Sequence, residues 1–190
     1  ISDYTMTEIT EYITNDFKAI DSNDSIAVIQ DFFSDLHFSH FPIVEEGVYI
    51  GSIASEDIET FDSDKKASDY RFALEGFFTR TNTIWLDVLE IFAKNHTNLV
   101  PVLDENNSYV GYYEIEDIMK FFHETPFLKK PGGIIIVKKG VLDYSMSQIA
   151  QIIESNNGKL LGLFISEAEV NSVEVTIKIA LGSMNEILQT

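Results

Sequence analysis

The sequence predicts an α+β protein with two parts. The first is a duplicated unit of strands and helices over roughly residues 1–125, and the second is a strand–helix–strand–strand–helix unit from about residue 131 onwards. Two observations predict this division. One segment recurs in register about 60 residues later, and after Pro131-Gly132-Gly133 the pattern changes to long β-branched runs around one amphipathic segment. With 45% hydrophobic and 12% aromatic residues the chain can form a buried core, so an intrinsically disordered chain is excluded.

The repeat is carried by the segments HFPIVEEGVYIGSIASEDI (His40–Ile58) and LVPVLDENNSYVGYYEIEDI (Leu99–Ile118). Pro42 matches Pro101 at an offset of 59, and Gly51 matches Gly111 at an offset of 60, because the second copy has one extra residue in its turn. A chance match would not keep proline, turn, glycine and aspartate in the same order. Four pairs upstream also match at the offset of 59: Ile26 and Trp85, Ile29 and Val88, Phe33 and Phe92, and His37 and His96.

Each copy predicts a short strand, a helix with apolar residues at helical spacing, two further strands joined by a polar turn, and a second helix. Between the copies, the linker Asp62–Tyr70 carries charge and no apolar period. In the first copy the strands are expected at Phe17–Ile20, Phe41–Val44 and Val48–Ile53, with helices at Ser25–Leu36 and from near Asp57. In the second copy the strands are expected at Gly76–Thr79, Leu99–Leu103 and Tyr109–Tyr113, with helices at Thr83–Asn95 and from near Asp117.

The last third predicts a different unit. The unbroken run Ile134–Val137 is typical of a strand that is buried on both faces. A helix is expected over Ser145–Ser155, and Asn156-Asn157-Gly158 should end it because Asn and Gly tolerate a left-handed conformation. Strands at Lys159–Ile165 and Ser172–Leu181 follow, and then Ser183 should cap a short helical start at Met184–Leu188.

Charge and composition exclude several classes of function. The net charge of −18 argues against nucleic acid or an anionic membrane surface as a partner, because both require basic patches. The first 61 residues alone carry a net charge of −12. The absence of cysteine excludes disulfides, thiol catalysis and Cys-ligated zinc. Because the chain opens Ile1-Ser2-Asp3, without Met or an apolar leader, we expect a fragment or processed form with no signal peptide, located in the cytoplasm.

Strand–helix–strand–strand–helix, repeated once, resembles the tandem cystathionine-β-synthase (CBS) domain pair. The residues that carry the resemblance are the proline-containing strand starts and the segments GSIASED and GYYEIED. The resemblance implies a regulatory ligand of adenine type, such as AMP, ADP, ATP or S-adenosylmethionine, bound in clefts between the copies. It also implies ligand-binding roles near the strand starts at Pro42 and Pro101.

The family pattern places Thr or Ser three residues after the glycine, for the phosphate or ribose, and Asp six residues after it, for the ribose hydroxyls. Asp57 and Asp117 stand at the Asp positions, but Ala54 and Glu114 occupy the hydroxyl positions. A carboxylate at Glu114 would repel a phosphate unless the phosphate turned away or a cation intervened. Arg80, ahead of the second copy's first helix, is a candidate phosphate partner, and a plain surface arginine is the alternative.

The order of elements in residues 134–190 resembles an ACT domain, a ferredoxin-like regulatory fold, here without its last strand. Such domains often bind amino acids where the first strand meets the helix. Asp143 and Ser145 are the candidates there, and helix capping is the alternative role. A CBS pair followed by an ACT domain resembles acetoin-utilisation-type regulatory proteins. The domains are therefore expected at 1–61, 62–130 and 131–190.

No pattern for catalysis or metal binding is present. HExxH, P-loop, GxGxxG and GxSxG motifs are missing, and the acidic turn from Asp104 has Tyr109 and Ile115 where a calcium loop needs Gly and Glu. The repeated histidines His37 and His96 are expected to be structural. We therefore expect a non-catalytic regulatory homodimer that senses an adenine-type ligand. The alternative is an assembly module whose ligand sites have degenerated, as Ala54 and Glu114 suggest.

Overall fold

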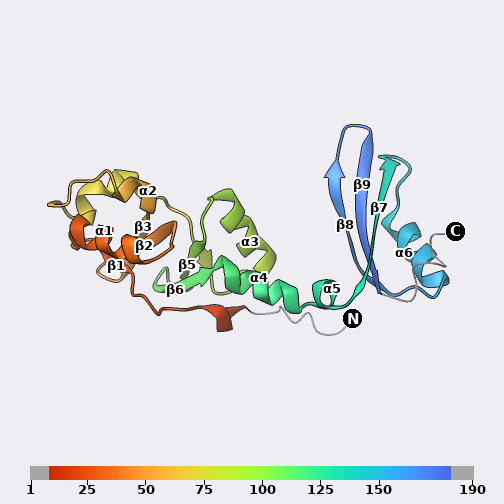
Figure 1. Ribbon diagram of the computed structural model, residues 1–190, viewed down its shortest axis with the longest axis horizontal. Coiled ribbons are helices and arrows are strands. Elements are labelled where there is room, and N and C mark those ends of the chain that lie inside the picture. The colour runs from red at the N-terminus through yellow and green to blue at the C-terminus, as the bar shows by residue number, and fades with distance from the viewer. Residues whose placement is uncertain (1–8, 181–190) are drawn as a thin grey trace. The chain divides into compact units, whose positions relative to one another are not determined.

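The computed structural model describes residues 9–180 and divides into two compact units, with the boundary between Phe121 and Phe122. The first unit holds the two copies of the repeat, and the second holds a separate sheet (Figure 1). The first copy contains β1 (Ile20–Asp21), α1 (Ile26–Asp35), β2 (His40–Glu45), β3 (Val48–Ala54) and α2 (Ser55–Ile58). The second copy contains β4 (Thr79–Arg80), α3 (Trp85–Lys94), β5 (Leu99–Leu103), β6 (Tyr109–Glu114) and α4 (Ile115–Glu124). The second unit contains α5 (Pro126–Lys129), β7 (Gly132–Gly140), α6 (Met146–Ser155), β8 (Leu160–Ala168) and β9 (Ser172–Ala180).

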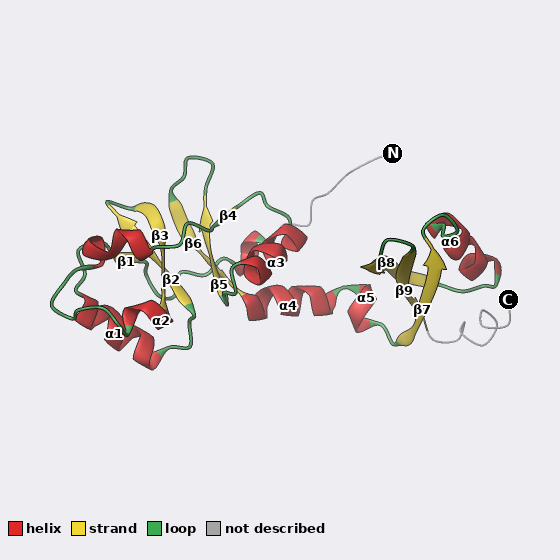
Figure 2. Ribbon diagram, turned by 90° about the horizontal axis from the view of Figure 1, so that it is seen from above, coloured by secondary structure: helices red, strands yellow, loops and turns green. Residues whose placement is uncertain are grey.

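Each copy forms a three-stranded sheet in which the first two strands are parallel and the last two antiparallel, in the orders β1-β2-β3 and β4-β5-β6 (Figure 2). This pairing explains how a proline is accommodated inside β2 and inside β5. Pro42 lies opposite Ser52, whose own N–H donates away from Pro42, to the Glu75 carbonyl at 2.8 Å. The nitrogen of Pro42 therefore points away from β3, to the side on which β1 pairs, but β1 begins only opposite Ile43. Proline, which has no N–H, therefore removes no hydrogen bond from the sheet here. Pro101 is placed the same way opposite Tyr112.

Each copy pairs with the segment that leads into the other copy, called here a lead-in segment. Thr14, ahead of the first copy, pairs with Tyr112 of β6, and Glu75, ahead of the second copy, pairs with Ser52 of β3. The close approach of these segments to β3 and β6 explains why glycine occurs at the same place in both copies. A side-chain carbon on Gly51 would lie 2.7 Å from the Leu74 Cβ, and one on Gly111 would lie 2.5 Å from the Thr14 carbonyl oxygen.

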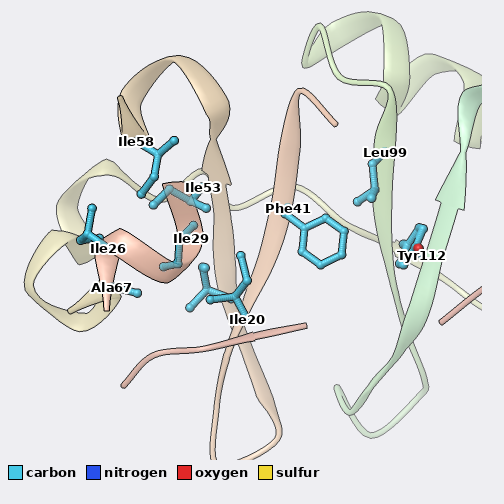
Figure 3. Packing of buried hydrophobic residues seen from close by; sticks show 10 residues of the cluster. Ile20, Ile26, Ile29, Phe41, Ile53, Ile58, Ala67, Leu99 and Tyr112 are labelled. Carbon is cyan, nitrogen blue, oxygen red and sulfur yellow. The ribbon is translucent and has the colours of Figure 1, made fainter. Parts of the chain in front are cut away.

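One hydrophobic cluster joins the copies. Phe41 of β2 is fully buried next to Leu99 and Tyr112 of the second copy, while Ile26 and Ile29 of α1 fill the other end (Figure 3). The predicted linker is more ordered than its composition suggests. It leads into a 3₁₀ helix at Ala67–Ala73, where Ala67 is fully buried and Tyr70 stacks on Phe61 with ring centroids 3.8 Å apart.

The second unit is an antiparallel sheet in the order β7-β9-β8, the order of the first three strands of a ferredoxin-like fold. Helix α6 covers one face through Ile149 and Ile153, and Asn157 ends the helix region at a positive φ of 57°, as expected. The prediction that Ile134–Val137 is buried on both faces is wrong. Within residues 9–180, strand β7 pairs only with β9, and the side chains of Ile134 and Ile136 are 63% and 60% exposed. The helical start expected at Met184–Leu188, capped by Ser183, lies outside the described residues.

Candidate functional site

The centre of the first unit has approximate two-fold symmetry. Ser39 and Asn98 stand at equivalent positions of the two copies and exchange hydrogen bonds: the Ser39 amide donates to the Asn98 Oδ1 at 2.9 Å, and the Asn98 amide donates to the Ser39 Oγ at 3.0 Å. The amides of Ser55 and Ile115 then donate to the carbonyls of Ser39 and Asn98, at 2.8 and 3.0 Å. The start of α2 and the start of α4 are therefore both fixed to this centre.

Two clefts lie on either side of this centre. The cleft called here the first cleft has a volume of about 330 Å³, and the second has a volume of about 190 Å³. Each combines the first turn of the second helix of one copy with the end of the first helix of the other copy. The first cleft is lined by Ser39, His40, Ala54, Ser55, Glu56, Asp57, Glu75, Asn95 and His96. The second cleft is lined by Leu36, His37, Phe38, Asn98, Glu114, Ile115 and Glu116.

In the first cleft, Asp57 is exposed in the first turn of α2 and Ala54 precedes that turn. The turn begins here because the strand β3 ends at Ala54 with extended backbone and Ser55 is held by the Ser39 carbonyl. The opposite side is formed by His40, which is buried and whose Nε2 lies 3.2 Å from Glu75 Oε1. The cleft thus offers an exposed carboxylate next to a histidine–glutamate pair.

In the second cleft, Glu114 is partly buried at the end of β6. Burial raises the pKa of the Glu114 carboxyl, and the neighbouring carboxylates of Asp117, Glu116 and Asp16 raise it further. Lys120, whose Nζ lies 3.0 Å from the Asp117 Oδ1, lowers the pKa of Glu114, and this is the smallest of these contributions. The second cleft is therefore a place where negative charge is already unfavourable.

The residues expected at the ligand site do not all meet. Asp57 and Ala54 line the first cleft, and Glu114 lines the second. Asp117 lies in the first turn of α4, pairs with Lys120 and is not among the residues that line the second cleft. Pro42 and Pro101 are buried within β2 and β5 and are not among the residues that line either cleft.

Arg80 is engaged elsewhere. One guanidinium nitrogen donates to the Asp104 carbonyl at 2.7 Å, another donates to the Asn107 Oδ1 at 2.6 Å, and the guanidinium lies 5.5 Å from the Phe78 ring centre. Arg80 is not among the residues that line the two clefts. In this structure its contacts are those of a residue that holds the β5–β6 turn.

The histidines are the residues whose place at the clefts was not anticipated. His37 lines the second cleft and His96 lines the first, each at the end of the first helix of the opposite copy. Their recurrence at an offset of 59 was the signal that could have found them. His40 and Glu75 have no counterpart pair in the second copy, where Leu99 stands at the position of His40, so the repeat gave no such signal.

Other candidate sites carry less chemistry. A hollow of about 430 Å³ lies between α1 and α2, with Glu59 as its carboxylate. Ser145 is the N-cap of α6 and accepts a hydrogen bond from the Gln148 amide at 3.4 Å, which is the capping alternative for that residue.

Within residues 9–180 no group of three or more His, Asp or Glu side chains is placed to hold a metal ion, and no helix there is long and apolar enough to cross a bilayer.

Comparison with known proteins bears on the first unit. A family model described as "CBS domain" matches residues 9–63 and 77–124, more than half of the chain. The uncharacterized protein MJ0188 of Methanocaldococcus jannaschii is 24% identical over 135 residues, which are 70% of this chain and 51% of that protein. The chain thus spans about half the length of the curated relative that it matches.

Solved structures agree with this match at the level of the fold. A CBS domain pair/ACT domain protein of Thermotoga maritima has a TM-score of 0.56 and 17% identity, over 62% of this chain and 97% of that chain. CBSX2 in complex with AMP has a TM-score of 0.51 and 11% identity, over 60% and 95% of the two chains. The cytosolic domain of the Mg²⁺ channel MgtE in complex with ATP has a TM-score of 0.51 and 18% identity, over 60% and 48%.

Proposed function

Because the chain belongs to the CBS domain family, we propose that it is a non-catalytic regulatory protein that binds an adenine nucleotide or adenosine-type ligand in the clefts between its two CBS repeats. The observation that carries the proposal is the first cleft. It brings the exposed carboxylate of Asp57, from one repeat, next to Asn95 and His96 from the other repeat. A ligand held there contacts both repeats, and so its binding stabilises one arrangement of the pair over others.

The chemistry of the first cleft fits a ribose. A carboxylate offers two acceptor oxygens and no donor, which suits the two neighbouring hydroxyls of a ribose. Asp57 is exposed in the first turn of α2, so its oxygens are accessible to a ligand in the cleft. Asp117 stands at the same place in α4, so we propose the corresponding role for it in the second cleft, with Glu114 beside it. Pro42 and Pro101 then act indirectly, by fixing the strands that begin directly after Ser39 and Asn98.

Relatives of the same fold support the class of ligand. CBSX2 is known in complex with AMP, and the cytosolic domain of the Mg²⁺ channel MgtE is known in complex with ATP. The second unit has the strand order of a ferredoxin-like fold, and a structurally similar protein of Thermotoga maritima is described as a CBS domain pair/ACT domain protein. We therefore propose that the second unit is an ACT-like domain to which ligand occupancy is coupled, in a cytoplasmic homodimer.

The proposal is tested by thermal unfolding of the full chain with adenosine, AMP, ADP, ATP or S-adenosylmethionine. A ligand that binds only the folded state stabilises it by about 2.7 kcal/mol at a hundredfold excess over its dissociation constant. At least one adenine compound should raise the melting temperature, and Asp57→Asn should weaken that compound's effect. Asp31→Asn is the matched control, because Asp31 is exposed on α1 and is not among the residues lining either cleft.

A second function is favoured by Ala54 and Glu114, which replace the hydroxyl of the family pattern in both repeats. On this alternative the pair is an assembly module with degenerate ligand sites. It predicts no change in melting temperature with any compound of the panel, and identical behaviour of Asp57→Asn and Asp31→Asn.

A further inference from the structure

The two clefts have an unusual charge for a site that would take a nucleotide. Carboxylates line both: Glu56, Asp57 and Glu75 in the first cleft, and Glu114 and Glu116 in the second. Among the described residues that line the clefts there is no lysine or arginine. A phosphate monoester carries close to two negative charges at neutral pH, and it would meet these carboxylates with no fixed positive charge on the walls.

The basic residues near the cleft residues in the sequence, Lys94, Arg80 and Lys120, do not themselves line the clefts. The guanidinium of Arg80 is held by the Asp104 carbonyl and the Asn107 side chain. The ammonium of Lys120 is 68% exposed and lies 3.0 Å from the Asp117 Oδ1, so part of its charge is already balanced. The cleft residues that can become positive are histidines, and His40 faces Glu75. Neither cleft therefore holds a preformed phosphate site.

The discrimination against a phosphate group is strongest in the second cleft, because of Glu114. It occupies the position from which a hydroxyl would be expected to meet the ligand, it is partly buried, and Asp16, Glu116 and Asp117 act on it electrostatically. A carboxylate in that position accepts hydrogen bonds from hydroxyl and amino groups and attracts a cation, but it repels a phosphate. In the first cleft Ala54 removes the hydroxyl without adding charge.

We propose that the clefts take an adenosine-type ligand that carries no phosphate and is uncharged or cationic, and that Glu114 is the specificity-determining residue of the second cleft. This rests on the proposed function, because it names the class of ligand for the same site. Adenosine represents the uncharged class, and S-adenosylmethionine, with its sulfonium and amino groups, represents the cationic class.

The test is isothermal titration calorimetry of the full chain at neutral pH, without Mg²⁺, using adenosine, S-adenosylmethionine, AMP and ATP as probes. Adenosine or S-adenosylmethionine should bind at least about tenfold more tightly than AMP, and raising the salt concentration should narrow this ratio because screening weakens the repulsion. Glu114→Gln should tighten AMP binding several-fold relative to S-adenosylmethionine binding, and AMP binding by the variant also shows that it is folded. The control Glu90→Gln removes the same charge from the exposed face of α3 and should leave every affinity as it is.

Three results would overturn the inference in different ways. If AMP or ATP binds more tightly than adenosine and S-adenosylmethionine, the ligand class is wrong but the proposed function stands. If Glu114→Gln behaves like Glu90→Gln, the role of Glu114 is wrong. If no adenine compound binds to the unaltered chain, the proposed function fails together with the inference.

Discussion

Gly51 and Gly111 are the residues at which the duplicated sequence meets its most severe steric demand. Their φ angles are +141° and +150°, a region that residues with a side chain rarely adopt. At Gly111 a Cβ would also lie 2.5 Å from the Thr14 carbonyl oxygen, which is backbone and cannot rotate away. The glycine is therefore needed twice, for its own conformation and for the approach of the lead-in segment.

Gly111→Ala should lower the free energy of unfolding by about 2–4 kcal/mol, since backbone strain and overpacking add. Urea unfolding measures this directly. Gly76→Ala is the control, because a Cβ there meets no atom within 4 Å. Equal stabilities of the two variants would show that the close pass between Thr14 and Gly111 is not a constraint on the fold.

Glu114 predicts a pH dependence of stability. Because its pKa is raised in the folded protein, the folded state binds this proton more tightly than the unfolded state does. The ionised carboxylate therefore destabilises the fold. This destabilisation is absent below about pH 4.3 and increases as the pH rises through the folded pKa. Solvent screening limits the effect to at most about 1 kcal/mol.

Glu114→Gln should thus be more stable than the unaltered chain at pH 7, and the difference should vanish near pH 4. Urea unfolding at a series of pH values measures it, with Glu90→Gln as the control whose difference stays near zero. A stabilisation by Glu114→Gln that is constant from pH 4 to pH 8 would contradict an electrostatic origin.

Recurrence in the two copies located only part of the expected site, since Asp117, Pro42 and Pro101 recur but line neither cleft. Asp57 and Ala54 were expected at a cleft and line one. Sequence spacing alone could not decide whether Arg80 lies at a ligand site. The hydrogen bonds that hold its side chain come from the turn at Asp104 and Asn107, 24 and 27 residues away. Side-chain direction depends on such contacts, and a one-dimensional pattern does not contain them.

Helices were predicted to within about two residues where a cap and an apolar stripe agree, as at α1 and α6. Strand Ile134–Val137 shows the limit of such patterns. A run of β-branched residues reads the same whether the strand is central or at an edge. Ile135 and Val137 pack in the core with α6, whereas the alternating residues Ile134 and Ile136 lie on the opposite face of the strand and are exposed.

The N-cap of α6 gives a prediction at this scale. Ser145→Ala should destabilise the second unit by about 1 kcal/mol, because the Gln148 amide loses its acceptor. Thermal unfolding measures the change, and Gln151→Ala, on the exposed middle of the helix, is the control. If Ser145→Ala instead removed an amino-acid ligand's stabilising effect and left unfolding without ligand unchanged, Ser145 would be a ligand contact and not a cap.

At the scale of the whole molecule, strand β7 bears on assembly. Among the described residues its backbone pairs with β9 on one side only, and Ile134 and Ile136 are exposed on its outer face. An exposed edge with apolar neighbours favours pairing with a second chain. We therefore expect light scattering after gel filtration to give twice the 21.5 kDa mass of one chain.

Ile136→Lys should weaken this dimer by about tenfold or more, because it places a charge on the proposed contact. Val170→Lys is the control, since Val170 is 92% exposed in the β8–β9 loop. A dimer that both variants leave intact would place the interface elsewhere, and a monomeric chain would exclude the homodimer.

The exchange of lead-in segments between the two copies has a consequence for how such a protein could have arisen. Each sheet is completed by a segment that precedes the opposite copy, Thr14 on β6 and Glu75 on β3. Two separate chains of one copy each could complete their sheets only by trading these segments with each other. The present chain therefore has the connectivity of a swapped dimer whose two halves are joined. In one chain the two clefts can carry different residues, as Ala54 in one and Glu114 in the other do.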